Sequence, residues 1–224
     1  MNLYFVVEGP QTEKKIYRAW LQHFFPHLTE VSRVEDVAKD NFYIIAGGGY
    51  PKYKCRINIA QEDMTTIRSV DYFFICVDAE EYTYDQKYTE IETLLTNKSG
   101  FQCHFIIIQH ACIETWFLGN RKFIRTNPQS QELRDWKAFH DVTQEDPEHM
   151  PARPPPSTRA KTHAAYLEKA VREHGLKYSK SRPGETTQKH YFQALRERWH
   201  DTQHIPSFGR LVEAFESIGA DFSE

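Results

Sequence analysis

Four apolar runs that show no alternation are the feature that most constrains the fold of this chain. The runs cover residues 3–7, 42–46, 72–77 and 104–108, and segments with helical spacing of apolar residues separate them. A strand without alternation is apolar on both faces, so it belongs inside a parallel sheet that helices cover on both sides. Strands that alternate with helices indicate βαβ units. The pattern predicts an α/β fold with a mostly parallel four-stranded sheet flanked by helices.

The second half of the chain has a different composition. Five of the eleven prolines fall within residues 144–157, including a run at residues 154–156. Such a stretch is typical of a linker or an extended loop at the rim of a domain. Beyond it, apolar residues recur at helical spacing in three segments. We expect an α/β domain over residues 1–125, a proline-rich connection over 126–157, and a C-terminal helical extension over 158–224 that packs on the same core.

Composition and cysteine use narrow the class of protein. Aromatic residues make up 14% of the chain and apolar residues 40%, which is enough for a core and excludes a disordered chain. The net charge of −3 excludes a polybasic coat for nucleic acid. The four cysteines form no CxxC pair, which argues against a disulfide framework or a zinc knuckle and favours a reducing cytoplasm. Cys76 and Cys103 lie in apolar runs, so both are expected to be buried.

Acidic residues follow two of the predicted strands. Glu8 comes directly after the first run, and Asp78 and Glu80 come after the third. The carboxyl ends of parallel strands are where sites gather in an open α/β sheet. Carboxylate oxygens are the ligands that Mg²⁺ prefers. The alternative is that these residues are ordinary polar turn residues, but the same position after two separate strands favours a metal site.

These motifs resemble the Toprim domain, the fold shared by topoisomerases, primases, OLD-family nucleases and small RNases. The likeness is greatest to small RloB-type and OLD-like Toprim proteins of bacterial anti-phage defence, whose first motif reads EG-x-x-TE-x-x-Y. The residues that match this motif are Glu8, Gly9, Thr12 and Glu13, and Tyr17 lies one position beyond the place of its tyrosine. The segment CIETWFL at residues 112–118 resembles their acidic-aromatic motif, and Tyr178-Ser179-Lys180 resembles a tyrosine–lysine step. The resemblance covers residues 3–118, with DxE at residues 78–80 in place of the usual DxD.

The resemblance implies a Toprim-like Rossmannoid fold and a metal-dependent nuclease that cleaves phosphodiester bonds in DNA or RNA. Mg²⁺ or Mn²⁺ would be the cofactor, held by Glu8, Asp78 and Glu80. Glu114 would hold a second ion or orient the first. Lys180 is predicted to be catalytic, because it follows a tyrosine in a segment that resembles a loop and could reach the transition-state phosphate.

Several alternatives stay open. Glu81 could replace Glu80 as a ligand, and Glu13 is either a further metal ligand or a residue that the helix dipole favours in a first turn. The chain carries no P-loop, so it could instead be a non-catalytic or conditionally activated Toprim partner of a separate ATPase. A homo-oligomer is also open. The N-terminal residues predict neither a signal peptide nor a membrane span.

Other signals are weaker. Gly47–Gly49 could approach a phosphate through backbone amides or be a flexible connection. The eleven histidines show no spacing typical of a zinc site. Arg153–Arg198 contains 11 basic and 4 acidic residues, so it is either the nucleic-acid surface or a solvated helix face. Trp116 and Phe117 are expected to turn into the core, which would let Glu114 face the acidic site.

Overall fold

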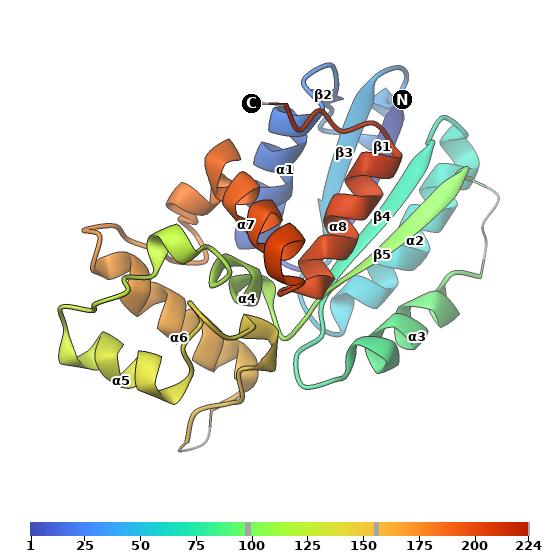
Figure 1. Cartoon of the computed structure of the whole chain (residues 1–224). Coiled ribbons are helices and arrows are strands. Elements are labelled where there is room, and N and C mark those ends of the chain that lie inside the picture. The colour runs from blue at the N-terminus through green and yellow to red at the C-terminus, as the bar shows by residue number, and fades with distance from the viewer. Residues whose placement is uncertain (97–99, 155–156, 224) are drawn as a thin grey trace. The chain divides into compact units, whose positions relative to one another are not determined.

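The computed structural model describes residues 1–96, 100–154 and 157–223 (Figure 1). The chain divides into two compact units. Unit 1 comprises Met1–Val77, Tyr84–Ile108 and Ala214–Glu224, and unit 2 comprises Asp78–Thr83 and Gln109–Glu213. Residues 155 and 156 of the predicted proline run lie outside the described residues. In the part that the structure describes, no helix is long and apolar enough to cross a membrane.

Unit 1 is built on a five-stranded sheet with the strand order β2-β3-β1-β4-β5. The strands are β1 (Asn2–Val7), β2 (Thr29–Glu30), β3 (Asn41–Ala46), β4 (Tyr72–Asp78) and β5 (Cys103–Gln109). Strand β1 pairs in parallel with both β3 and β4, and β2 pairs in parallel with β3. The predicted α/β class with a parallel sheet is confirmed. The predicted number of strands is wrong, because β2 has only two polar residues and no apolar run to indicate it.

Helices α1 (Thr12–Phe24), α2 (Lys52–Ile67) and α3 (Tyr84–Leu94) belong to unit 1. All six residues of β1 are buried, as expected of a strand covered on both faces. Tyr4 bonds to Asp63 of α2, whereas the next residue, Phe5, contacts Tyr17 of α1. Neighbouring strand residues point to opposite faces, so α1 and α2 cover opposite sides of the sheet.

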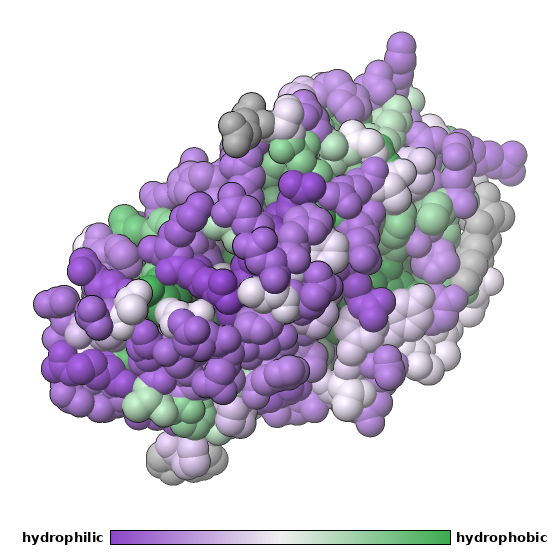
Figure 2. All heavy atoms as spheres, in the orientation of Figure 1, coloured by the Kyte–Doolittle hydropathy of each residue, from purple (hydrophilic) through white to green (hydrophobic). Residues whose placement is uncertain are grey.

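Unit 2 is mainly helical. Its helices are α4 (Ile113–Phe117), α5 (Gln131–Phe139), α6 (Arg159–Arg172), α7 (Lys189–Thr202) and most of α8 (Pro206–Ser217). Helix α5 and a 3-10 turn at Pro147–His149 lie within the range predicted to be a proline-rich connection. Trp116 and Phe117 are fully buried, as predicted. The side chains on the face shown in Figure 2 are mostly hydrophilic.

The four cysteines are free thiols. Cys76 is buried as expected, but the prediction for Cys103 is wrong, because this residue is exposed. Cys103 is the first residue of β5, and burial in this strand begins only at Ile106. The first three residues of β5 are therefore less buried than the last four.

Candidate acidic site

Glu8 is held in unit 1 by the backbone that surrounds the end of β1. Its N–H donates to the carbonyl of Cys76 in β4 at 3.0 Å, and its carbonyl accepts from the N–H of Gly49 at 3.0 Å. The N–H of Gly47 donates to the carbonyl of Val7 at 2.7 Å. Two amides of the glycine loop are thus already bonded to protein, which favours its interpretation as a structural connection. The side chain of Glu8 is buried.

Glu13 lies in the first turn of α1 and is also buried. A Cβ atom at position 9 would clash with Oε2 of Glu13. The carboxylate of Glu13 therefore lies directly against the turn that follows Glu8, and a larger residue at position 9 would require this side chain to move. This contact gives a packing reason for the pairing of Gly9 with Glu13 in the first motif.

A buried lysine lies near Glu8 in the same unit. Nζ of Lys87 donates to the hydroxyl of Tyr53 at 3.0 Å, and only 1% of Lys87 is exposed. Burial raises the pKa of Tyr53 to about 12, the bond to Lys87 opposes this, and the negative charge of Glu8 adds to it. Glu8 is therefore within electrostatic reach of the Tyr53–Lys87 pair. Sequence reasoning missed Lys87, although it lies three residues after Tyr84 and four before Ile91, on the apolar stripe of α3.

Asp78, Glu80 and Glu81 follow one another in unit 2. Asp78 is the last residue of β4 and is 6% exposed. The turn after it is fixed by backbone bonds from Ala79 to Gln109 at 2.8 Å and from Glu80 to Ala111 at 2.9 Å. Glu80 has a φ of 54° and is half-buried.

Arg159 ties the turn formed by residues 78–83 to the start of α6. Its backbone N–H donates to Oε1 of Glu81 at 2.8 Å, and its guanidinium donates to the carbonyl of Glu80 at 2.8 Å. Glu81 is exposed and has Arg159 as its partner. This arrangement favours a tethering role for Glu81 over the alternative in which it replaces Glu80 as a ligand.

Glu114 lies in α4 and is almost fully buried, with 1% of the residue exposed. The hydroxyl of Tyr178 donates to its Oε1 at 2.9 Å, across 64 residues of sequence. Burial raises the pKa of the Cys112 thiol, and the charges of Glu114 and Asp78 raise it further. Both carboxylates therefore lie within electrostatic reach of one thiol. Sequence reasoning had matched Tyr178 only to a motif, and its bond to Glu114 was not foreseen.

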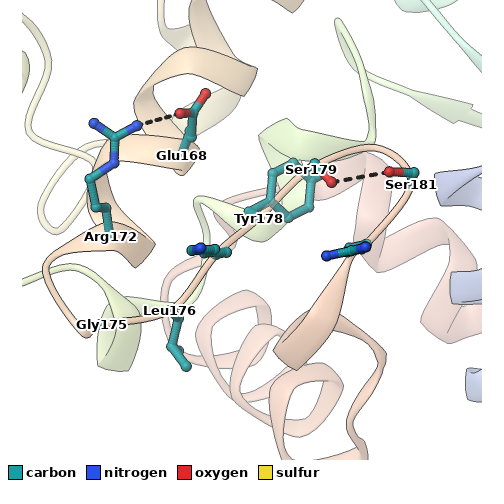
Figure 3. Close-up of a pocket in the computed structure, with 9 residues that line it drawn as sticks. Glu168, Arg172, Gly175, Leu176, Tyr178, Ser179 and Ser181 are labelled. Atoms are coloured by element: carbon teal, nitrogen blue, oxygen red, sulfur yellow. Dashed lines mark hydrogen bonds and ion pairs between the residues drawn. The ribbon is translucent and has the colours of Figure 1, made fainter.

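Lys180 is exposed on the loop that follows α6. Antiparallel bonds between Ser179 and Arg182 close this loop into a tight turn. The loop borders a pocket in unit 2, shown in Figure 3, and Tyr178 contributes to its wall. Lys180 itself is not among the residues that line the pocket, so its catalytic role stays a prediction.

The predicted metal ligands fall into two groups. Glu8 and Glu13 belong to unit 1, whereas Asp78, Glu80 and Glu114 belong to unit 2. Among the described residues, no group of three or more His, Cys, Asp or Glu side chains is arranged to hold a metal ion. The chemistry of the donors nevertheless fits one class of ion. Carboxylate oxygens without histidine or thiolate suit Mg²⁺ or Mn²⁺ and do not suit a structural zinc ion.

Comparisons with known proteins give no match to a family model, to a curated protein or to a solved structure. The Toprim resemblance therefore rests on the sequence motifs and stays a prediction.

Proposed function

We propose that this chain is a Toprim-type, metal-dependent nuclease that cleaves DNA or RNA as an effector of anti-phage defence. The observation that supports the proposal most is the burial of Asp78 and Glu114 within reach of the same thiol. Removing each of the two carboxylates from water costs several kcal/mol, so burying both adds two such costs. A divalent cation would offset both costs, which gives these residues a physical reason to be acidic.

Each residue has a distinct role in the proposal. A bound Mg²⁺ or Mn²⁺ would polarise the scissile phosphate and lower the pKa of a bound water. Asp78 and Glu80 would present carboxylate oxygens from the turn after β4. The hydroxyl of Tyr178 fixes the orientation of the Glu114 carboxylate, which is the task of a residue behind a metal ligand. Glu8, Glu13 and Lys180 receive their roles from the resemblance alone.

Metal affinity tests the proposal without requiring an activated enzyme. Titration calorimetry with Mn²⁺ should show binding to the wild type and a loss of at least tenfold in Asp78→Asn and Glu114→Gln. Both changes keep the shape of the side chain and remove its charge. Glu62→Gln is the matched control, because Glu62 is an exposed carboxylate on α2. A wild type that binds no divalent cation would contradict the proposal.

Cleavage assays on DNA and RNA form the second arm. Glu8→Ala and Asp78→Ala should abolish cleavage while the circular dichroism spectrum is unchanged. A wild type that binds metal but cuts neither substrate would favour the alternative of a subunit that a separate ATPase activates. Variants that still cut at the wild-type rate would remove Glu8 and Asp78 from the active site.

A further inference from the structure

A pocket of about 620 Å³ lies in unit 2 between the end of α6 and the loop that follows it (Figure 3). This volume is within the range of about 300–1,000 Å³ that is usual for small-molecule sites. The residues that line it are Glu168, Arg172, Gly175, Leu176, Lys177, Tyr178, Ser179, Ser181 and Arg182. The set combines an aromatic ring, an aliphatic side chain, hydroxyls and cations.

The charge of the lining is positive. The lining contains three basic residues, Arg172, Lys177 and Arg182, and one acidic residue, Glu168. Glu168 forms an ion pair with Arg172. Lys177 and Arg182 are exposed, and among the described residues neither forms an ion pair. Two cations at the rim of a pocket, without acidic partners, favour an anionic ligand such as a phosphate.

The wall of the pocket is connected to the acidic residues. Tyr178 lines the pocket, donates to Oε1 of Glu114, and packs against Phe117 with ring centroids 6.1 Å apart. Tyr178 and Leu176 give the pocket its apolar part, and the hydroxyls of Ser179 and Ser181 lie 3.3 Å apart at its edge. A ligand in the pocket would thus contact the residue that orients a proposed metal ligand.

We propose that this pocket binds one unpaired nucleotide of the substrate strand. The proposal rests on the nuclease function proposed above and specifies its substrate as single-stranded or locally unpaired nucleic acid. A nucleotide supplies both parts that the lining requires: a phosphate for Lys177 and Arg182, and a flat base for the wall formed by Leu176 and Tyr178. Since the pocket has room for a small molecule, a paired base would have to leave its duplex to enter it.

The test measures binding in EDTA, where metal-dependent cleavage cannot occur. Fluorescence anisotropy would compare a short single-stranded oligonucleotide with an abasic strand of the same length and charge. The pocket variant is Lys177→Ala/Arg182→Ala. The matched control is Arg121→Ala/Lys122→Ala, which removes the same charge from an exposed 3-10 turn of the same unit. Thermal melts would confirm that both variants fold.

The pocket variant should lose at least tenfold in affinity for the oligonucleotide, and the control should lose less than threefold. The wild type should prefer the oligonucleotide to the abasic strand, because only the oligonucleotide carries the bases that would contact Leu176 and Tyr178. Equal losses in the two variants, equal binding of the two strands, or no binding by the wild type would each overturn the proposal.

The outcomes separate this proposal from the nuclease function. If oligonucleotide binding depends on the pocket but the protein neither cleaves nucleic acid nor binds metal, the pocket proposal is supported and the nuclease proposal is contradicted. If cleavage depends on Asp78 but is unchanged in Lys177→Ala/Arg182→Ala, the nuclease proposal is supported and the pocket proposal is contradicted.

Discussion

The two units have interiors of different chemistry. In unit 1, Phe74 stacks on Phe5 and on Phe105, with ring centroids 4.4 Å and 4.7 Å apart. All three residues belong to strands of the sheet. In unit 2, Arg198 is 3% exposed and donates to the carbonyls of Gly119, Val142 and Glu145. Aromatic rings also pack in unit 2, where the ring of Trp116 lies 5.4 Å from that of Phe208. Arg198 differs from all of these rings because it depends on backbone acceptors.

This difference determines which substitutions each unit tolerates. Apolar burial has no direction, so a core accepts a change that keeps most of its volume. A buried hydrogen-bond network requires each donor to meet its acceptor, and a partly satisfied network is worse than none. Unit 1 should therefore be sensitive to volume, whereas unit 2 should be sensitive to hydrogen-bond geometry.

The largest expected effect is at Arg198. Arg198→Ala should lower the free energy of unfolding by about 3–5 kcal/mol, because it leaves several buried carbonyls without a donor. Arg198→Lys should recover less than half of this loss, since an ammonium group cannot reproduce the planar fork. Chemical denaturation measures both values. Arg121→Ala is the control and should change stability by less than about 0.5 kcal/mol. A full rescue by lysine would show that the charge matters and the geometry does not.

The second prediction concerns pH and Glu148 in unit 2. Oε1 of Glu148 accepts from both the N–H and the hydroxyl of Ser207, and the Ser207 hydroxyl oxygen also accepts from Nε1 of Trp116. Burial raises the pKa of Glu148 from 4.5 to about 7. The folded state therefore binds this proton more tightly than the unfolded state. Its contribution to stability is complete below pH 4.5 and falls by up to about 1.4 kcal/mol per pH unit as the pH rises toward 7.

Denaturation of the wild type and Glu148→Gln at pH 5 and at pH 7.5 measures this effect. The stability difference between the two proteins should change over this interval, because only the wild type carries the titrating carboxylate. Comparing the two proteins is necessary because burial lowers the pKa of His163 to about 4, which makes stability fall as the pH drops below 6.5. Parallel stability curves would show that Glu148 does not titrate in this interval.

A conservative change in unit 1 should have a smaller effect. Ile75 is fully buried in β4, and its register partner in β1 is Val6. Ile75→Val removes one methylene and should cost about 0.5–1.5 kcal/mol, measured by the same denaturation assay. Ile75→Val can be compared directly with Arg198→Lys, because each replaces a residue by the amino acid most similar to it in shape and chemistry. A loss at Ile75 as large as that at Arg198 would contradict the distinction between the two interiors.

Four of the five strands were predictable from sequence because each contains a largely apolar run. Each of the four apolar runs became a strand whose ends differ from the run by at most one residue. The interior of unit 2 was not predictable in this way. Arg198 and Glu148 are residue types that usually lie on surfaces, and the carbonyl of Val142 that accepts from Arg198 is 56 residues away. The local periodicity of a sequence does not indicate a partner this far away in the chain.

The candidate site divides along the same line. Asp78 and Glu8 were indicated by their position after apolar strands, which is a local signal. The bond between Tyr178 and Glu114 spans 64 residues and could not be inferred from spacing. Lys87 had a local signal, a cation on the apolar stripe of α3, but a lysine on such a stripe is usually assigned to the surface.

Lys87 offers the smallest expected effect and the sharpest contrast with Arg198. Both are buried cations, but the charged partner of Lys87 keeps another ion pair when Lys87 is removed. Glu90, which lies 2.8 Å from its Nζ, also pairs with Lys54. Burial alone would lower the pKa of Lys87, but the bonds to Glu90 and Tyr53 raise it above its ordinary value, so the group is charged.

Lys87→Met should therefore be nearly neutral for stability, within about 1 kcal/mol, because Glu90 is partly exposed and keeps its ion pair with Lys54, so no buried charge is left without a partner. If Lys87 is there for function, the same variant should lose at least tenfold in nucleic-acid cleavage, because Glu8 is within reach of the Tyr53–Lys87 pair. Denaturation and cleavage assays on one preparation measure both values. If Lys87→Met instead destabilises the protein as much as Arg198→Ala does, Lys87 has a structural role. The buried cations of the two units would then respond to substitution in the same way.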